Sequence, residues 1–132
     1  MTESVTSIGS EAFYRCSGLT SIIIPNSVTS IGYVAFAGCS SLASITIPNS
    51  VNHIGYGAFT DTAWYDNQPD GIVYAGKVII GYKGTMPEGT SIDIEEGTLG
   101  IAGGAFEDCY GLTSVTIPTS VVSIGYGIFS GW

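Results

Sequence analysis

Three cysteines have the widest chemical range in this sequence, because a thiol can form a disulfide, bind a metal or act as a nucleophile. They are Cys16, Cys39 and Cys109. Their number is odd, no Cys-x-x-Cys pair is present, and each follows a phenylalanine by three residues. Since free cysteine is commonly buried as a small hydrophobic residue, we interpret them as a structural ladder of reduced thiols.

Two groups of acids invite comparison with metal and glycosidase sites. Asp61, Asp66 and Asp70 stand five and four residues apart, whereas a calcium loop needs alternating oxygen donors, a glycine and a closing glutamate. Asp93 and Glu95 would share one face of a strand, as a carboxylate pair for glycoside hydrolysis requires, but no aromatic sugar platform stands beside them. We therefore predict no metal site and no cofactor.

The only histidine, His53, occupies a position that serine fills in other repeats, so we expect it to be exposed. A Ser-His-Asp triad depends on geometry rather than order, but the sequence has no Gly-x-Ser-x-Gly nucleophile turn. Gly100, Gly103 and Gly104 fall within the repeat frame rather than in a phosphate loop, and we interpret them as coil corners. The sequence thus predicts no catalytic residue.

A recurring sequence motif, Ile-Gly-x-x-Ala-Phe with variations, indicates the repeated structure that positions the cysteine, acidic and histidine side chains. Its opening isoleucines are Ile8, Ile31, Ile54, Ile101 and Ile124. The steps between them are 23, 23, 47 and 23 residues, so the third step is two periods plus one residue. A period in the twenties predicts a solenoid, in which each coil buries its apolar side against its neighbours.

Each regular coil contains one strand-like segment that ends at a proline, such as Leu19–Pro25. Alternation points Ile22 and Ile24 inward and the residues between them outward. We expect these parallel strands to form a single, hydroxyl-rich sheet on the concave face, which is the usual binding surface of a solenoid. Its candidate contact residues are Ser21, Ile23, Ser44, Thr46, Asp93, Ser114 and Thr116.

All five phenylalanines share one phase of the repeat: Phe13, Phe36, Phe59, Phe106 and Phe129. Stacked coils would place their rings above one another, so we predict one internal column. Alanine precedes four of the five, which suits a short helical turn packed closely on its neighbour.

The repeat resembles that of the BspA-like bacterial leucine-rich-repeat family. The likeness rests on Ile31-Gly32-x-x-Ala35-Phe36-x-x-Cys39-x-x-Leu42-x-x-Ile45-x-Ile47-Pro48-x-Ser50-Val51 and covers nearly the whole chain. It implies a right-handed leucine-rich-repeat solenoid, and right-handedness is also expected for parallel strands joined by crossovers. It further implies a secreted or surface-anchored protein used for adhesion or protein binding, and it supplies no catalytic residues.

One coil departs from the repeat between Phe59 and Ile101. Two β-type runs flank Ala75-Gly76 there, which predicts a hairpin. We expect a single domain, 1–132, in which a variant coil and hairpin at about 60–90 fill a coil position. The distinctive side chains of this segment include Trp64, Tyr65, Asp66, Asn67 and Tyr74. They form either a recognition patch or a plug in which Trp64 replaces the missing leucine and polar residues make turns.

Tyr33, Tyr56 and Tyr126 also share one phase of the repeat. Two interpretations are open: an exposed ridge that binds a peptide or sugar, or a cover along the edge of the phenylalanine column.

Charge excludes some partners. The chain carries three Lys and Arg residues against 11 acids, for a net charge of -8, which would repel nucleic acid and anionic membrane surfaces. No apolar stretch approaches the roughly 20 residues of a membrane span, and no leader-like segment opens the chain.

The sequence therefore favours a non-enzymatic module for protein or glycan contact, outside the cell by the resemblance. The alternative is a structural spacer, and a carboxylate enzyme is a third hypothesis. Neither end has a polar capping repeat, and Trp132 falls in phase with Cys39. We expect either a segment of a longer array or end-to-end self-association.

Overall fold

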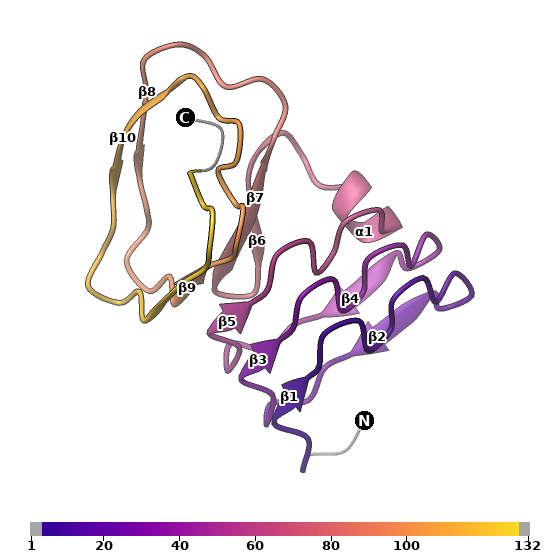
Figure 1. The fold of residues 1–132 in the computed structure, drawn as a ribbon. Coiled ribbons are helices and arrows are strands. Elements are labelled where there is room, and N and C mark those ends of the chain that lie inside the picture. The colour runs from indigo at the N-terminus through magenta and orange to yellow at the C-terminus, as the bar shows by residue number, and fades with distance from the viewer. Residues whose placement is uncertain (1–3, 130–132) are drawn as a thin grey trace.

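The computed structural model describes residues 4–129 as a β-solenoid with little helix (Figure 1). Trp132 lies outside the described residues. The elements in chain order are β1 (Ser7–Ile8), β2 (Ser21–Ile23), β3 (Ser30–Ile31), β4 (Ser44–Thr46), β5 (His53–Ile54), α1 (Ala63–Asp66), β6 (Gly71–Ala75), β7 (Val78–Lys83), β8 (Thr90–Asp93), β9 (Gly100–Ile101), β10 (Leu112–Thr116) and β11 (Ser123–Ile124).

Each regular coil contributes two short strands, and both pair in parallel with the next coil. The register Ser7↔Ser30 and Ser30↔His53 advances by one 23-residue period at each step, which confirms the predicted solenoid. The expected alternation is also confirmed at the end of β2, because Ile23, its last residue, is 74% exposed and the following Ile24 is 2% exposed. The short strand that follows each proline turn, such as β3, is not predicted as a strand, because the sequence shows only an apolar pair there.

The segments around the phenylalanines are hydrogen-bonded turns rather than helices. The N–H of Phe13 donates to the carbonyl of Ala35 and the N–H of Phe36 to that of Ala58, both at 2.8 Å. These bonds run between coils, so the same N–H groups cannot serve an i→i−4 helical ladder. Arg15, at φ +59°, helps the chain turn back within the coil.

The phenylalanine rings form two columns, not the single column predicted. In the first, Phe36 lies between Phe13 and Phe59, with ring centroids 5.1 Å and 5.5 Å away and nearly parallel planes. The column ends at Trp64, whose ring lies 5.3 Å from Phe59 at 60°. The tryptophan therefore closes the column where the variant coil begins.

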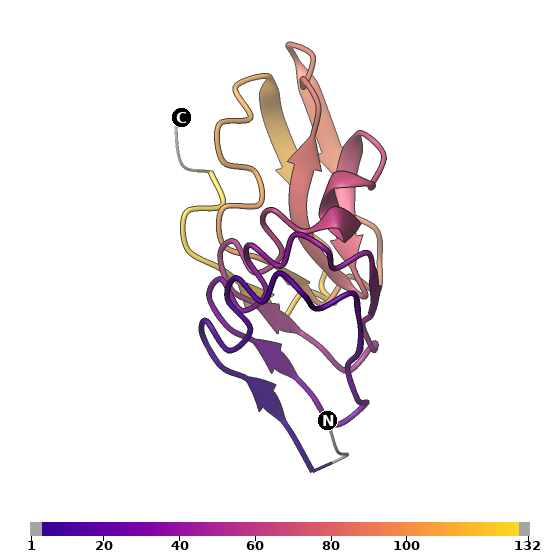
Figure 2. The same ribbon diagram turned by 90° about the vertical axis from the view of Figure 1, so that its right-hand side faces the viewer.

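The second column pairs Phe106 with Phe129 at 6.3 Å and belongs to a separate core. We call the coils of residues 4–70 the first stack and those of residues 84–129 the second stack. Each has its own buried cluster, the first around Phe36 and the second around Phe106. Figures 1 and 2 show the two stacks as separate sets of coils, inclined to one another.

The β6–β7 hairpin separates the two cores. Strand β7 pairs in antiparallel fashion with β6 and in parallel with β9, where Ile79 lies opposite Ile101. Val78 and Ile80 pack against the first core, whereas Ile79 and Tyr82 pack against the second. This sheet, of order β11-β9-β7-β6, is covered on both faces, which explains why Val78-Ile79-Ile80 is a continuous apolar run.

Close contacts between the stacks involve two of the glycines that we interpreted as coil corners. A Cβ at Gly100 would collide with the carbonyl oxygen of Asn52, and one at Gly104 would collide with the ring of Tyr56. Gly100 lies in β9 rather than at a corner. The close approach of the two stacks therefore explains Gly100, whereas Gly103 and Gly104 lie in a turn, as the coil-corner interpretation expects, and Gly104 has φ +72°.

Candidate functional site

The hydroxyl-rich strands do not form the single concave sheet that we predicted. They form two two-stranded sheets, β2–β4 and β8–β10, which lie on opposite sides of the molecule in Figure 1. The break occurs because the third coil has α1 and the hairpin in place of a further strand. The predicted contact residues are all exposed, but they do not lie on one surface. Ser21, Ile23, Ser44 and Thr46 lie on the first sheet, and Asp93, Ser114 and Thr116 lie on the second.

The residues of the variant coil are also divided. Trp64 is half-buried against the first core, whereas Asp66 and Asn67 are exposed at the end of α1. Tyr74 packs against the second core, and its hydroxyl lies 3.2 Å from Oγ1 of Thr98. The packing position of Trp64 agrees with the plug interpretation, and Tyr74 does not join a patch with it.

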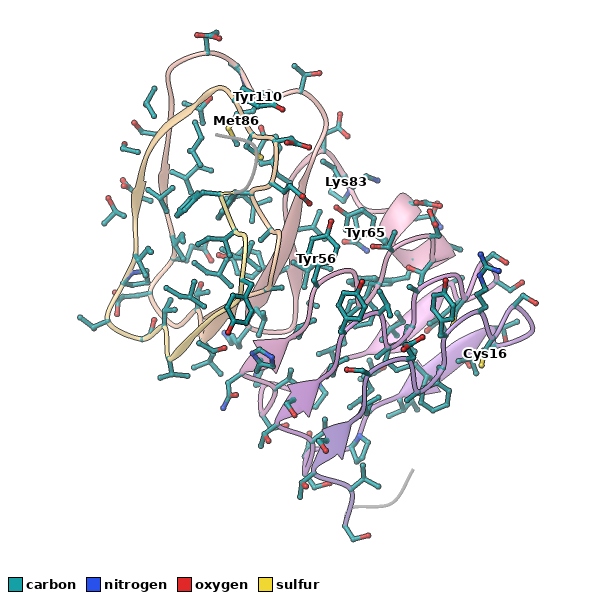
Figure 3. The ribbon with its side chains drawn as sticks, viewed as in Figure 1. Cys16, Tyr56, Tyr65, Lys83, Met86 and Tyr110 are labelled. Carbon is teal, nitrogen blue, oxygen red and sulfur yellow. The ribbon has the colours of Figure 1, made fainter. Side chains whose placement is uncertain are left out.

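Lys83 fixes α1 to the hairpin. Its Nζ donates to the carbonyl oxygens of Tyr65 (3.2 Å), Asp66 (2.8 Å) and Gln68 (2.8 Å) and lies 5.6 Å from the centre of the Tyr65 ring. Figure 3 shows Tyr65 and Lys83 together beside α1. Burial raises the pKa of the Tyr65 phenol. This lysine has a structural role at the carbonyl end of a short helix.

An exposed aromatic surface lies where the two stacks meet. The rings of Tyr33 and Tyr56 are stacked at 6.2 Å and are 53% and 44% exposed, while Tyr126 is 97% exposed. Two interpretations of these tyrosines follow from the sequence, an exposed ridge and a cover for the phenylalanine column. Their exposure favours the ridge.

These tyrosines line a groove of about 610 Å³, which we call the junction groove. It spans both stacks and is lined by Tyr33, His53, Tyr56, Gly103, Ile124 and Tyr126, among others. Ile124 is 52% exposed. Exposed apolar and aromatic groups gathered in one concavity commonly mark a contact site.

His53 crosses from one stack to the other at the edge of this groove. The ring is exposed, as expected, and its Nδ1 lies 2.9 Å from Oγ of Ser123. The two residues occupy the same phase of the repeat, and Gly100, which pairs with Ser123, occupies that phase in the neighbouring coil. Because glycine has no side chain, the histidine can reach the serine.

Tyr56 links the stacks a second time. Its hydroxyl donates to Oε2 of Glu107 at 2.7 Å, and Figure 3 shows the ring between the two sets of coils. Beyond this ring lies a second groove, of about 590 Å³, whose lining includes Asp61, Asp66 and Asp108. The aromatic ring therefore separates an uncharged groove from an acidic one.

The link gives a pH-dependent prediction. The hydrogen bond to Glu107, followed by partial burial, raises the pKa of Tyr56 above its ordinary value near 10. Because the folded-state pKa is raised, the stabilisation is complete below about pH 10 and is lost as the pH rises through the folded-state value. In ¹³C NMR of labelled tyrosines, the pKa of Tyr56 should lie above the ordinary tyrosine value, and Glu107→Gln should lower it. An unchanged Tyr56 titration in that variant would contradict the link.

Two of the three thiols are buried, as the ladder interpretation requires, and all three are free. Sγ of Cys39 donates to the carbonyl of Phe13 at 2.9 Å, and burial raises the pKa of both Cys39 and Cys109. Cys16 is exposed. The residues that the structure describes hold no group of three or more His, Cys, Asp or Glu placed for a metal ion.

Thiol reactivity should follow this burial. Against an aromatic disulfide reagent at pH 8, we expect Cys16 to react at least about tenfold faster than the other two, since attack needs an accessible thiolate. Cys16→Ser should remove the fast phase and leave the slow phase unchanged. Equal rates for all three thiols in the folded protein would show that Cys39 and Cys109 are not protected by burial.

One signal for the junction groove was present in the sequence. Tyr33, Tyr56 and Tyr126 share their phase with Gly103, so the column of tyrosines lacks one member. Ile124 could not be identified in this way, because its counterparts Ile31, Ile54 and Ile101 are buried.

Comparison with known proteins gives a family and several related folds. The family described as BspA type leucine rich repeat region matches residues 1–67 and 84–132 in six copies. The unmatched residues are those of the hairpin and its approach. No curated protein matches the sequence.

Solved structures that are similar include three leucine-rich repeat proteins. A leucine-rich repeat protein of T. pallidum is 30% identical over 96% of this chain, with a TM-score of 0.51. One from Bacteroides ovatus is 37% identical over 96% of this chain, also with a TM-score of 0.51. A leucine-rich cell surface protein of Faecalibacterium prausnitzii is 27% identical over 95%, with a TM-score of 0.43. The chain covers 48%, 33% and 48% of the respective proteins.

Within the described residues, no helix has both the length and the apolar character needed to cross a membrane.

Proposed function

Since this chain belongs to the BspA-type leucine-rich repeat family, we propose that it is a non-enzymatic module that binds a protein or glycan, in adhesion at a bacterial cell surface. Members of the family are generally non-enzymatic repeat proteins and are often found at the cell surface. The chain spans half or less of its structural relatives, so the activity of the whole protein is part of this proposal.

The observation that supports contact most strongly is the exposure of large apolar side chains around the junction groove. Tyr33, Ile124 and Tyr126 are more than half exposed, and they lie in one concavity. Such a cluster is unfavourable in water unless a partner covers it. Tyrosine is also enriched among the residues that dominate binding energy at interfaces.

The hydroxyl-rich sheets are a weaker candidate for the contact surface. They hold few of the aromatic and arginine side chains that dominate interfaces, and Ser114 donates to Ser91 at 2.9 Å rather than standing free. If they bind, we expect weak contacts that act through many copies.

A panel of immobilised extracellular proteins and glycans would test the proposal. We expect the wild-type chain to bind at least one member of the panel, reversibly and above a matched acidic control protein. The control is needed because the net charge of -8 allows non-specific binding to cationic surfaces.

The alternative function is a structural spacer without a dedicated site. The regular hydrogen bonds between coils favour it, because they are what a rigid array needs. If no panel member bound the chain, alone or within its longer parent, the spacer would replace the contact module.

A further inference from the structure

The junction groove is lined by residues that share one phase of the repeat. At this phase five coils carry Ser10, Tyr33, Tyr56, Gly103 and Tyr126, and all five of these residues line the groove. Adjacent Tyr33 and Tyr56 stack on each other, whereas Gly103, packed closely against Tyr56 and Tyr126, adds no ring to the column. The groove therefore has aromatic walls and a backbone floor.

The chemistry of the lining favours an uncharged ligand. The groove is lined by tyrosine, glycine, isoleucine, serine and histidine, with no Asp, Glu, Lys or Arg. An anionic ligand would also meet the repulsion of a chain with net charge -8. A cationic peptide would instead favour the acidic groove beyond Tyr56. The occupant of the junction groove should therefore be neutral.

The backbone carbonyl groups of the three tyrosines offer little to a peptide. The carbonyl groups of Tyr33, Tyr56 and Tyr126 already accept the N–H groups of Glu11, Val34 and Gly104, at 2.9, 3.0 and 3.0 Å. A peptide that added itself as a strand would need such groups unpaired. The aromatic rings and the side-chain polar groups of the groove suit a ligand with one apolar face and hydroxyl groups at its edge.

Polar groups for such hydroxyls stand at the edge of the groove. His53 uses Nδ1 in its contact with Ser123, which leaves Nε2 for a ligand hydroxyl, and Ser10 lies at the other end of the tyrosine column. The volume of about 610 Å³ falls in the range of small-molecule sites, about 300–1,000 Å³.

We infer that the junction groove binds an uncharged hexopyranoside, whose ring packs on the exposed face of Tyr126 and whose hydroxyl groups contact His53. This inference rests on the proposed contact function and specifies its ligand as a neutral glycan rather than a protein. Binding through one short groove is weak for a single copy, and repetition in a longer array would strengthen it.

Titration with neutral oligosaccharides of glucose, galactose, mannose and N-acetylglucosamine, followed by saturation-transfer NMR and tyrosine ¹³C shifts, tests this inference. We expect at least one sugar to bind and to shift Tyr33 and Tyr126. Tyr126→Ala should weaken binding about tenfold or more, while Tyr126→Phe keeps most of it, since the ring face makes the contact. Because Tyr126 is 97% exposed, the alanine variant should fold normally, which a thermal melt would verify.

Tyr110→Ala is the matched control. This tyrosine is 70% exposed and lies far from Tyr56 in Figure 3, so its loss should leave sugar binding unchanged. A lack of binding by all sugars up to about 10 mM, which corresponds to about 2.7 kcal/mol, would overturn the inference. So would binding that Tyr126→Ala does not weaken.

The proposed function can survive the failure of this inference. If a protein or a neutral proline-rich peptide bound in a Tyr126-dependent manner and no sugar did, the glycan inference would be wrong and the contact function would stand. If neither bound, both would fail and the spacer would remain.

Discussion

Replacing Phe36 with alanine is expected to lower the free energy of unfolding by about 3–5 kcal/mol, the usual cost of removing a buried ring. Phe36 is fully buried between Phe13 and Phe59, so its loss leaves a cavity with a ring on each side. Because a small domain is stable by only about 5–15 kcal/mol, the variant should be near the limit of folding. Urea unfolding followed by circular dichroism measures the change.

Phe129→Ala is the matched control for this variant. The same substitution at the same phase removes a ring that is 37% exposed, and we expect a clearly smaller loss. If the two variants lost equal stability, burial in the column would not be what stabilises the first stack.

Gly100→Ala is expected to destabilise the protein by about 1–3 kcal/mol, because the new Cβ collides with backbone and forces the two stacks apart. The colliding atom is the carbonyl oxygen of Asn52, which cannot rotate away as a flexible side chain would. The displacement should also break the contact between His53 and Ser123. Urea unfolding gives the stability change, and the His53 ring resonances report the contact.

Gly18→Ala provides the comparison. Nothing lies within 4 Å of a Cβ built at Gly18, so this change should be neutral or stabilise by about 0.4–1 kcal/mol through the unfolded chain. If Gly100→Ala were as mild as Gly18→Ala, the close approach of the stacks in solution would be disproved.

The repeat was predictable because its determinants are local. The positions of Val28 and Ile31 are apolar in the neighbouring coils too, and both residues are fully buried. The turn serines repeat as well, and Oγ of Ser50 donates to the carbonyl of Val28 in the preceding coil at 2.7 Å. Any coil that satisfies these positions stacks on the next. Periodicity alone therefore predicts the coils.

The junction was not predictable because its contacts are not periodic. A single glycine at position 100 and a hairpin with apolar residues on both faces are enough to end one core and begin another. The phase of Tyr33 and Tyr56 was visible in the sequence, but whether their rings covered a column or faced solvent depended on how the stacks met. For the same reason the predicted single sheet became two.

The most direct test of a contact function at the junction compares two variants that remove different surfaces. The junction variant is Tyr33→Ser with Tyr126→Ser, and the sheet variant is Ile23→Ser with Thr46→Ala; all four residues are exposed, so both variants should fold. Affinity for the ligand found in the panel is measured by biolayer interferometry. We predict that the junction variant binds at least about 100-fold more weakly, a loss of about 2.7 kcal/mol, and that the sheet variant binds as the wild type does. The opposite pattern, with binding lost in the sheet variant and kept in the junction variant, would contradict the account.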